Sequence, residues 1–158
     1  MLEQPINTLR FLTDYCDGLL QDIAPEEFAD PTDAGLNPPA WIVGHLAYAF
    51  DRHGTLVGLD PELAEWKDLF AKGSTLSDPT KYPPKDELVA ALHKAIDRLA
   101  DGVNAASDDT LTGPNEYLRS ERLPTLGDFL TYSMTGHFAS HLGQLSAWRR
   151  AKGRPPLF

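Results

Sequence analysis

The chain has little cysteine and no long apolar run. Its one cysteine, Cys16, excludes an intramolecular disulfide and is typical of a protein from the reducing cytoplasm. No apolar stretch approaches the roughly 20 residues that span a bilayer. The first residues carry no positive segment followed by an apolar run, as a secretory signal would. We therefore expect a cytoplasmic protein that has no membrane segment.

Positive charge is also scarce. The sequence has 14 Lys and Arg against 23 Asp and Glu, which gives a formal net charge of -9. The one cationic cluster lies at the C-terminal end and contains Arg149, Arg150, Lys152 and Arg154. It coincides with the last turn of a predicted helix, where cations interact favourably with the helix dipole. The sequence therefore predicts no nucleic-acid partner.

The sequence has no convincing strand pattern, whereas apolar residues recur at spacings of three and four. At 158 residues it predicts a single domain over residues 1–158. Four amphipathic helices are expected over residues 5–23, from 37–39 to 54 or 58, from 85 to at least 103, and over 125–153. A short helical piece within 60–73 belongs to a long connection between the second and third helices. The prediction is an all-α four-helix bundle with that long connection.

Three histidines occupy positions that otherwise read as inward, apolar helix faces: His45, His137 and His141. His137 and His141 are four residues apart, so both side chains lie on one face of a helix and can bind one ion. A single buried histidine is usually a hydrogen-bonded core residue. Three of them predict a divalent-metal site, with zinc, nickel or iron as candidate metals. Three protein ligands leave one coordination position open for water or substrate.

The remaining histidines, His53 and His93, are expected to be solvated surface residues. No obvious acid or base accompanies the metal ligands, since Asp51 and Asp128 are expected to lie turns away. Cys16 reads as a small core residue of the first helix rather than as a nucleophile.

Several neighbours of the expected ligands permit two interpretations. Trp41 and Gln144, one turn away, could shape the pocket or could make ordinary packing and polar contacts. Gly44 and Gly136 each precede a ligand, which fits space for a bound molecule or tight helix packing.

Three segments together resemble the DinB-like (YfiT-like) family: residues 37–47, residues 137–145, and the ending 149–156. The resemblance implies a four-helix bundle, often a homodimer, with a metal held by His45, His137 and His141. It also implies relatives that are transferases or isomerases and that use a low-molecular-weight thiol activated by the metal.

The main hypothesis is a metal-dependent enzyme that transfers a low-molecular-weight thiol to a small electrophile. One alternative is a metal-dependent hydrolase, since a bound cation can also activate water. A second is a non-enzymatic stress-response or binding module with a structural metal. A third, a helical interaction protein without metal, leaves the inward histidines unexplained.

Overall fold

The computed structural model describes residues 2–33, 35–74 and 78–157, and the described residues form helices and turns without any β-strand. The long helices are α1 (Glu3–Leu20), α2 (Pro39–Gly54), α4 (Lys85–Ala105) and the consecutive α6 (Leu126–Tyr132) and α7 (Phe138–Ala151). Shorter ones are α3 (Lys67–Phe70) and α5 (Asp108–Thr112), with 3₁₀ turns at Pro25–Glu27, Thr55–Val57, Ala64–Trp66 and Pro79–Lys81. The all-α prediction is confirmed. None of the described helices combines the length and the apolar character needed to cross a membrane.

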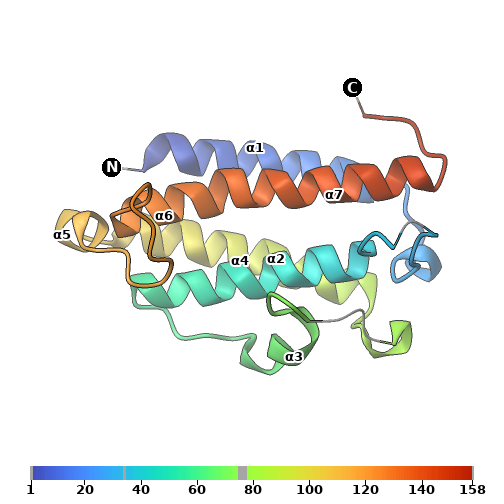
Figure 1. The fold of residues 1–158 in the computed structure, drawn as a ribbon, viewed down its shortest axis with the longest axis horizontal. Helices are drawn as coiled ribbons and strands as arrows, with labels where there is room; N and C mark the ends of the chain where they lie inside the picture. Colours follow the sequence, from blue (N-terminus) through green and yellow to red (C-terminus); the bar gives the residue numbers. More distant parts are fainter. Residues whose placement is uncertain (1, 34, 75–77, 158) are drawn as a thin grey trace.

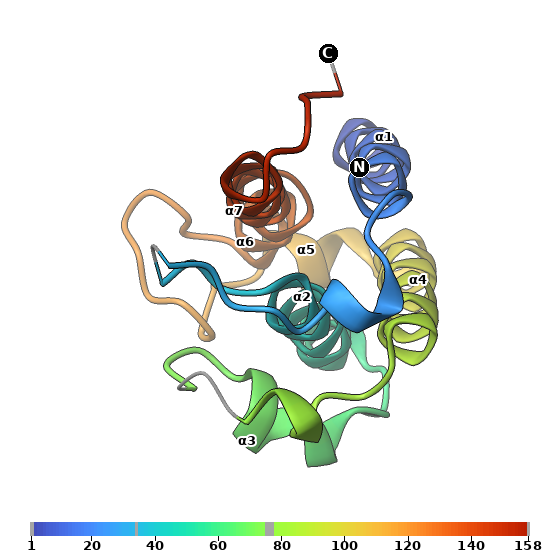
Figure 2. The ribbon, with the colours of Figure 1, turned by 90° about the vertical axis from the view of Figure 1, so that its right-hand side faces the viewer.

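The four long helices form a bundle in which each packs on two others (Figures 1 and 2). Helices α1 and α7 run in one direction, and α2 and α4 run in the opposite direction (Figure 1). Because α2 and α4 are parallel neighbours, the chain must return along the bundle between them. The segment 55–84, which contains α3, makes that return and confirms the predicted long connection.

Helix α2 begins within the predicted range of residues 37–39, and Asn37, a residue type that often caps helices, does not cap it. Pro38 occupies the N-cap position in an extended conformation, and the helix begins at Pro39 with no side-chain cap. Proline fits there because the first helical residues need no backbone N–H donor. Asn37 instead donates a long hydrogen bond of 3.5 Å to Gln144 on α7.

The core is built from the apolar faces of all four helices. The largest fully buried side chains include Phe50, Phe70, Phe138 and Trp148. Cys16 is 1% exposed, which confirms its predicted place in the core of α1. Burial, together with the negative charge of Asp17, raises the pKa of its thiol to about 12.

The helix predicted over residues 125–153 is continuous, as α6 and α7, but contains one irregular turn. Thr125 and Asp128 form a capping box at its start. Residues Ser133–His137 then form a π-helical turn between α6 and α7. Such turns are rare and occur often at functional sites. This one ends at His137, one of the expected metal ligands.

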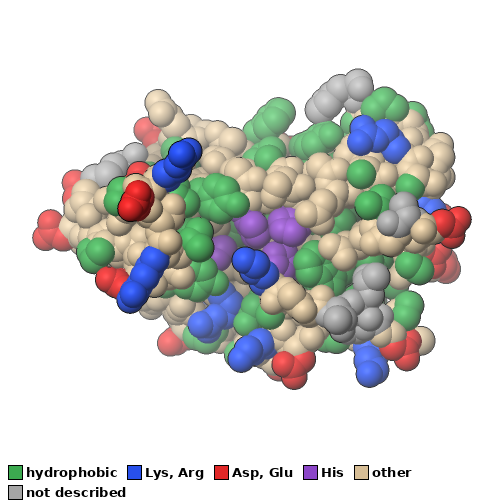
Figure 3. Space-filling model, viewed as in Figure 1, with side chains coloured by type: hydrophobic (Ala, Val, Ile, Leu, Met, Phe, Trp, Pro, Cys, Tyr) green, Lys and Arg blue, Asp and Glu red, His purple; other side chains and the backbone are tan. Residues whose placement is uncertain are grey.

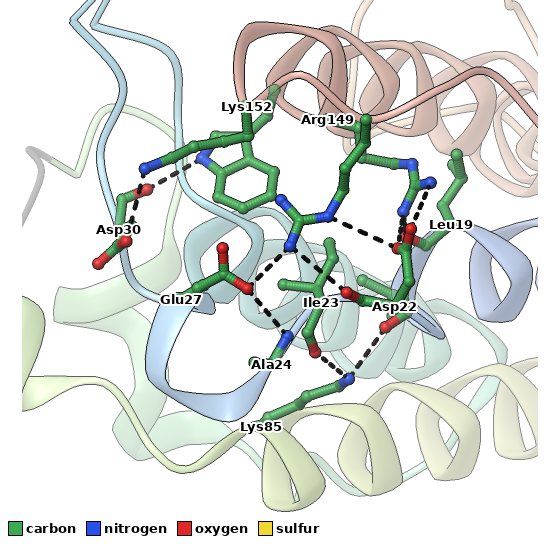
Figure 4. Close-up of polar contacts among 12 residues, drawn as sticks. Leu19, Asp22, Ile23, Ala24, Glu27, Asp30, Lys85, Arg149 and Lys152 are labelled. Carbon is green, nitrogen blue, oxygen red and sulfur yellow. Dashed lines mark hydrogen bonds and ion pairs between the residues drawn. The ribbon is translucent and has the colours of Figure 1, made fainter.

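The C-terminal cationic cluster closes one end of the bundle rather than only matching a helix dipole. Arg149 is buried, donates to the Leu19 carbonyl oxygen, and pairs with the Asp22 carboxylate (Figure 4). Arg154 forms ion pairs with Asp22 and with Glu27. These contacts join the C-terminal ends of α1 and α7.

Candidate metal centre

His45 is held in one orientation by α2 and the connection that follows it. Its ring stacks on Trp41, one turn earlier, with 4.8 Å between ring centroids and 7° between planes. Its Nδ1 lies 2.7 Å from the carbonyl oxygen of Phe70. Because a carbonyl oxygen only accepts, Nδ1 must carry the proton. The Nε2 atom of His45 is then left with a free lone pair for a ligand.

His137 and His141, on the helix that α6 and α7 form together, face His45 on α2. His137 is the last residue of the π turn, and His141 lies one turn later on α7. The ligand atoms of all three side chains lie within 4.8 Å of one another. His45 Nε2 and His137 Nε2 are 3.4 Å apart. A tetrahedral zinc ion with Zn–N bonds of about 2.0–2.1 Å would hold two ligand nitrogens about 3.3–3.4 Å apart.

All three imidazoles are neutral at physiological pH. Burial is the main cause, and it lowers the pKa of His45, of His137 to about 4, and of His141 to about 3. The neighbouring imidazoles lower the pKa of His137 and His141 further. Neutral imidazole is the form that binds a metal ion.

Two ring nitrogens of this group lack hydrogen-bond partners. His137 Nδ1 and His141 Nδ1 are buried and unpaired within the described part of the chain. An unsatisfied buried polar group costs on the order of 1–3 kcal/mol. Hydrogen bonding within the protein therefore does not account for the burial of these two rings, whereas neutral rings with converging nitrogens fit a divalent cation.

The three histidines line a cavity of about 430 Å³. Figure 3 shows histidine side chains grouped in a hollow on one face, with apolar and cationic side chains around it. The wall from α2 includes Trp41, Tyr48 and Arg52. Trp41 is therefore both a wall of the pocket and a packing residue, since it is only 8% exposed.

Gly44 has a packing role. A Cβ atom built on it would lie 2.2 Å from the Phe70 ring, which is fully buried. Tight packing between α2 and α3 therefore explains this glycine. The same close approach brings the Phe70 carbonyl to His45.

The prediction that His53 is a solvated surface residue is wrong. Its side chain is buried, lines the same cavity, and its Nδ1 is hydrogen-bonded to Ser133 Oγ at 2.7 Å. Burial, and next the charge of the neighbouring His137, lower the pKa of His53 to about 3. The sequence offered a signal in the spacing, because position 53 follows position 45 by eight residues and so shares its helix face.

Two further residues considered from the sequence, His93 and Asp51, lie outside the histidine cluster. His93 is half-exposed and pairs with Asp17 at 2.8 Å, as expected of a surface residue. Asp51 is buried but accepts hydrogen bonds from the Glu62 and Leu63 amides and from Arg98, away from the cavity lining. Both therefore have surface or structural roles.

Comparison with known proteins supports the fold and the family. The model of the DinB superfamily matches residues 8–145. Among solved structures, YfiT from Bacillus subtilis is similar, with a TM-score of 0.64 and 16% sequence identity. The match covers 97% of this chain and 88% of YfiT, which is described as a probable metal-dependent hydrolase with an unusual four-helix bundle topology. No curated protein sequence matches the chain.

At 16% identity the likeness to YfiT establishes a shared four-helix fold and no shared chemistry. The superfamily match carries more weight, because it spans α1 to α7 and includes all three clustered histidines. The chain therefore belongs to the DinB superfamily.

Proposed function

We propose that this protein is a metal-dependent enzyme that acts on a small molecule, with the metal bound by His45, His137 and His141. The observation that carries the proposal is three neutral imidazoles converging within 4.8 Å on the wall of a 430 Å³ cavity. A structural metal would normally be enclosed by four protein ligands. Three ligands at an open cavity fit a site that admits a further molecule.

The residues around the proposed site have separable roles. A divalent cation bound there would lower the pKa of a coordinated thiol or water and so supply a nucleophile at neutral pH. Trp41 and the Phe70 carbonyl fix the His45 ring. Tyr48, Tyr117 and Phe129 add aromatic side chains to the cavity walls.

The proposed reaction is transfer of a low-molecular-weight thiol to a small electrophile. This choice of nucleophile is supported by the family resemblance of the three motif segments. Hydrolysis is the second candidate, and it is favoured by the description of YfiT as a probable metal-dependent hydrolase. A binding module with a structural metal is the third.

One assay separates the three candidates. Protein loaded with zinc, nickel or iron is incubated with a reactive aryl halide and an activated ester, each with and without glutathione, bacillithiol or mycothiol. Thiol transfer predicts metal-dependent loss of the halide only when a thiol is present. Thiol-independent ester cleavage would instead establish hydrolysis, and no turnover of either compound by metal-loaded protein would favour the binding module. His141→Ala should abolish either activity, and Cys16→Ala should abolish neither.

The homodimer, the cytoplasmic location and the single-domain organisation remain predictions. Light scattering of the purified chain would test the first, and fractionation of the native host cell would test the second. A single cooperative unfolding transition of the full chain would agree with the third.

A further inference from the structure

Arg52 differs from the other buried or half-buried Lys and Arg residues in having no acceptor to bind its side chain in the part of the chain that the structure describes. Within the described residues, five Lys or Arg side chains belong to buried or half-buried residues: Arg52, Lys85, Arg98, Arg149 and Arg154. Four of them are bound by carboxylates or backbone carbonyls of the protein. Arg52 has no such partner among the described residues. A partly desolvated guanidinium without an anion is unfavourable, so its position suggests a ligand.

Arg52 lies on the same face of α2 as His45. The residues of α2 that line the cavity are Trp41, His45, Tyr48, Ala49, Arg52 and His53, which follow the helical period. Arg52 comes seven residues after His45, which corresponds to about 10 Å along the helix axis. A small organic molecule could therefore reach the histidine group with one end and Arg52 with the other.

The cavity is cationic in a protein that is acidic as a whole. Arg52 and Lys72 line it, and no described Asp or Glu does. The complete chain has 23 acidic and 14 basic residues. A cleft lined by one sign of charge concentrates ligands of the opposite sign. The charge of this lining therefore favours an anion.

The cavity is also apolar at its rim. Five large hydrophobic side chains are markedly exposed among the described residues, and three of them line this cavity: Tyr117, Leu118 and Tyr132. The Tyr117 ring packs edge-on against His53 with 5.3 Å between centroids. Apolar surface gathered around a pocket is typical of a binding site for an apolar group.

We propose that the cavity binds a small organic carboxylate with an aromatic or aliphatic body. The carboxylate pairs with the Arg52 guanidinium, which can donate two parallel hydrogen bonds to it. The body lies against the tyrosines of the rim, and the opposite end reaches the three histidines. The one guanidinium in the cavity lining, which lacks a protein partner among the described residues, matches a single negative charge. This inference deepens the proposed function by naming a substrate class, and its orientation of the ligand rests on that function.

Binding of a matched pair of probes tests the proposal without any turnover. Naphthalene-2-carboxylate and its neutral carboxamide have nearly the same shape, and their dissociation constants are measured by calorimetry on metal-free protein. We expect the carboxylate to bind about tenfold or more tightly than the carboxamide, as a charge-assisted hydrogen bond implies. Arg52→Gln should remove this preference, and Arg52→Lys should retain part of it.

Arg150→Gln is the matched control, because Arg150 is an exposed arginine on α7 outside the cavity lining. It should leave the preference unchanged. Equal binding of the two probes to the wild type, or an unchanged preference in Arg52→Gln, would overturn the proposal. Circular dichroism of each variant checks that the helices are intact.

The two proposals can fail separately. If the protein retains no metal but prefers the carboxylate probe through Arg52, the metal-dependent function is wrong and the carboxylate site is supported. If the protein catalyses a metal-dependent reaction but shows no preference for the carboxylate probe that depends on Arg52, the carboxylate site is wrong and the function is supported.

In an active preparation, kinetics then show which substrate carries the carboxylate. We compare kcat/KM for charged and neutral electrophiles with a neutral thiol, and for charged and neutral thiols with a neutral electrophile. If Arg52→Gln lowers kcat/KM only for the charged electrophile, the electrophile carries the carboxylate that Arg52 binds. If it does so only for the charged thiol, the thiol carries it. An Arg52→Gln variant that lowers neither value would overturn the proposal.

Discussion

At the scale of single residues, Ser133 is the partner of a buried histidine in the cavity wall. Its hydroxyl is 2.7 Å from His53 Nδ1, and Ser133 and His53 are 0% and 5% exposed. Ser133→Ala should destabilise the fold by about 1–2 kcal/mol, because it leaves a buried ring nitrogen without a hydrogen bond. Urea denaturation measures the change. Ser140→Ala, in an exposed serine of the same cavity, serves as control and should cost less than about 0.5 kcal/mol.

Cys16 illustrates a nucleophilic atom that the fold makes inert. The side chain is 1% exposed and burial raises the pKa of the thiol to about 12, so little thiolate forms at neutral pH. We expect a thiol reagent to leave the native protein unlabelled for as long as it stays folded and to label it promptly in denaturant. Rapid labelling of the native protein would contradict the assigned burial.

The metal-ligand candidates could be found from sequence because polar residues interrupted apolar stripes at positions 45, 137 and 141. Arg52 looks like an ordinary polar residue near a helix end, and the one sequence signal for His53 was its eight-residue spacing from His45. What distinguishes them is the wall opposite, built by Phe129 and Ser133 and by Tyr117 in the loop before α6. That loop has no periodicity, so nothing in the sequence indicated where it packs.

At the scale of elements, the contact between α2 and α3 positions His45, a proposed metal ligand. Gly44→Ala would place a methyl group 2.2 Å from the rigid, buried Phe70 ring. Either the ring or the helix must move, at a cost of about 1–3 kcal/mol. We expect a lower melting temperature and weaker metal affinity, since the Phe70 carbonyl holds His45. Gly143→Ala on α7 is the control, because a Cβ there meets nothing within 4 Å. Equal metal affinity in both variants would contradict the coupling.

The lengths of the elements were largely predictable and their irregularities were not. The period of the apolar residues predicted all four long helices, and α1 begins two residues earlier and ends three residues earlier than expected. The π turn at Ser133–His137 was not predicted, because the inward positions of residues 130–145 recur at spacings of three and four, as in an unbroken α-helix. The short helices α3 and α5 depend on tertiary packing more than on local preference.

At the scale of the whole molecule, one ion pair links the ends of two helices. Arg149 on α7 lowers the pKa of Asp22, just after α1, by hydrogen bonding to its carboxylate. A folded-state pKa below the ordinary value of 3.8 means that the stabilisation is complete above that pH and is lost as pH falls. Asp22→Asn should cost about 1 kcal/mol at pH 7, a modest value because half of the carboxylate side chain is exposed to solvent.

The measurement is the free energy of unfolding of wild type and Asp22→Asn between pH 3 and pH 7. The two curves should converge at the acidic end. An Asp14→Asn variant, in an exposed carboxylate of α1, should follow the wild type throughout. A difference between wild type and Asp22→Asn that is constant over the whole range would contradict an ionic role for Asp22.

The direction of the helices was predictable only in part. A connection of thirty residues between α2 and α4 is long enough for a return along the bundle, which makes a parallel pair possible. Which helices become neighbours depends on how all four apolar faces fit together, and a single sequence does not reveal that.

Binding of one divalent metal ion by His45, His137 and His141 is central to the function proposed for this molecule. Elemental analysis of the purified protein tests it most directly, on wild type, on the alanine variant of each of the three residues, and on His93→Ala as the surface control. We expect about one metal ion per chain in wild type and in His93→Ala, and a sharp loss in each of the three ligand variants, all with helical circular dichroism spectra. Equal metal content in all five proteins, or no metal in the wild type after loading, would contradict the assignment.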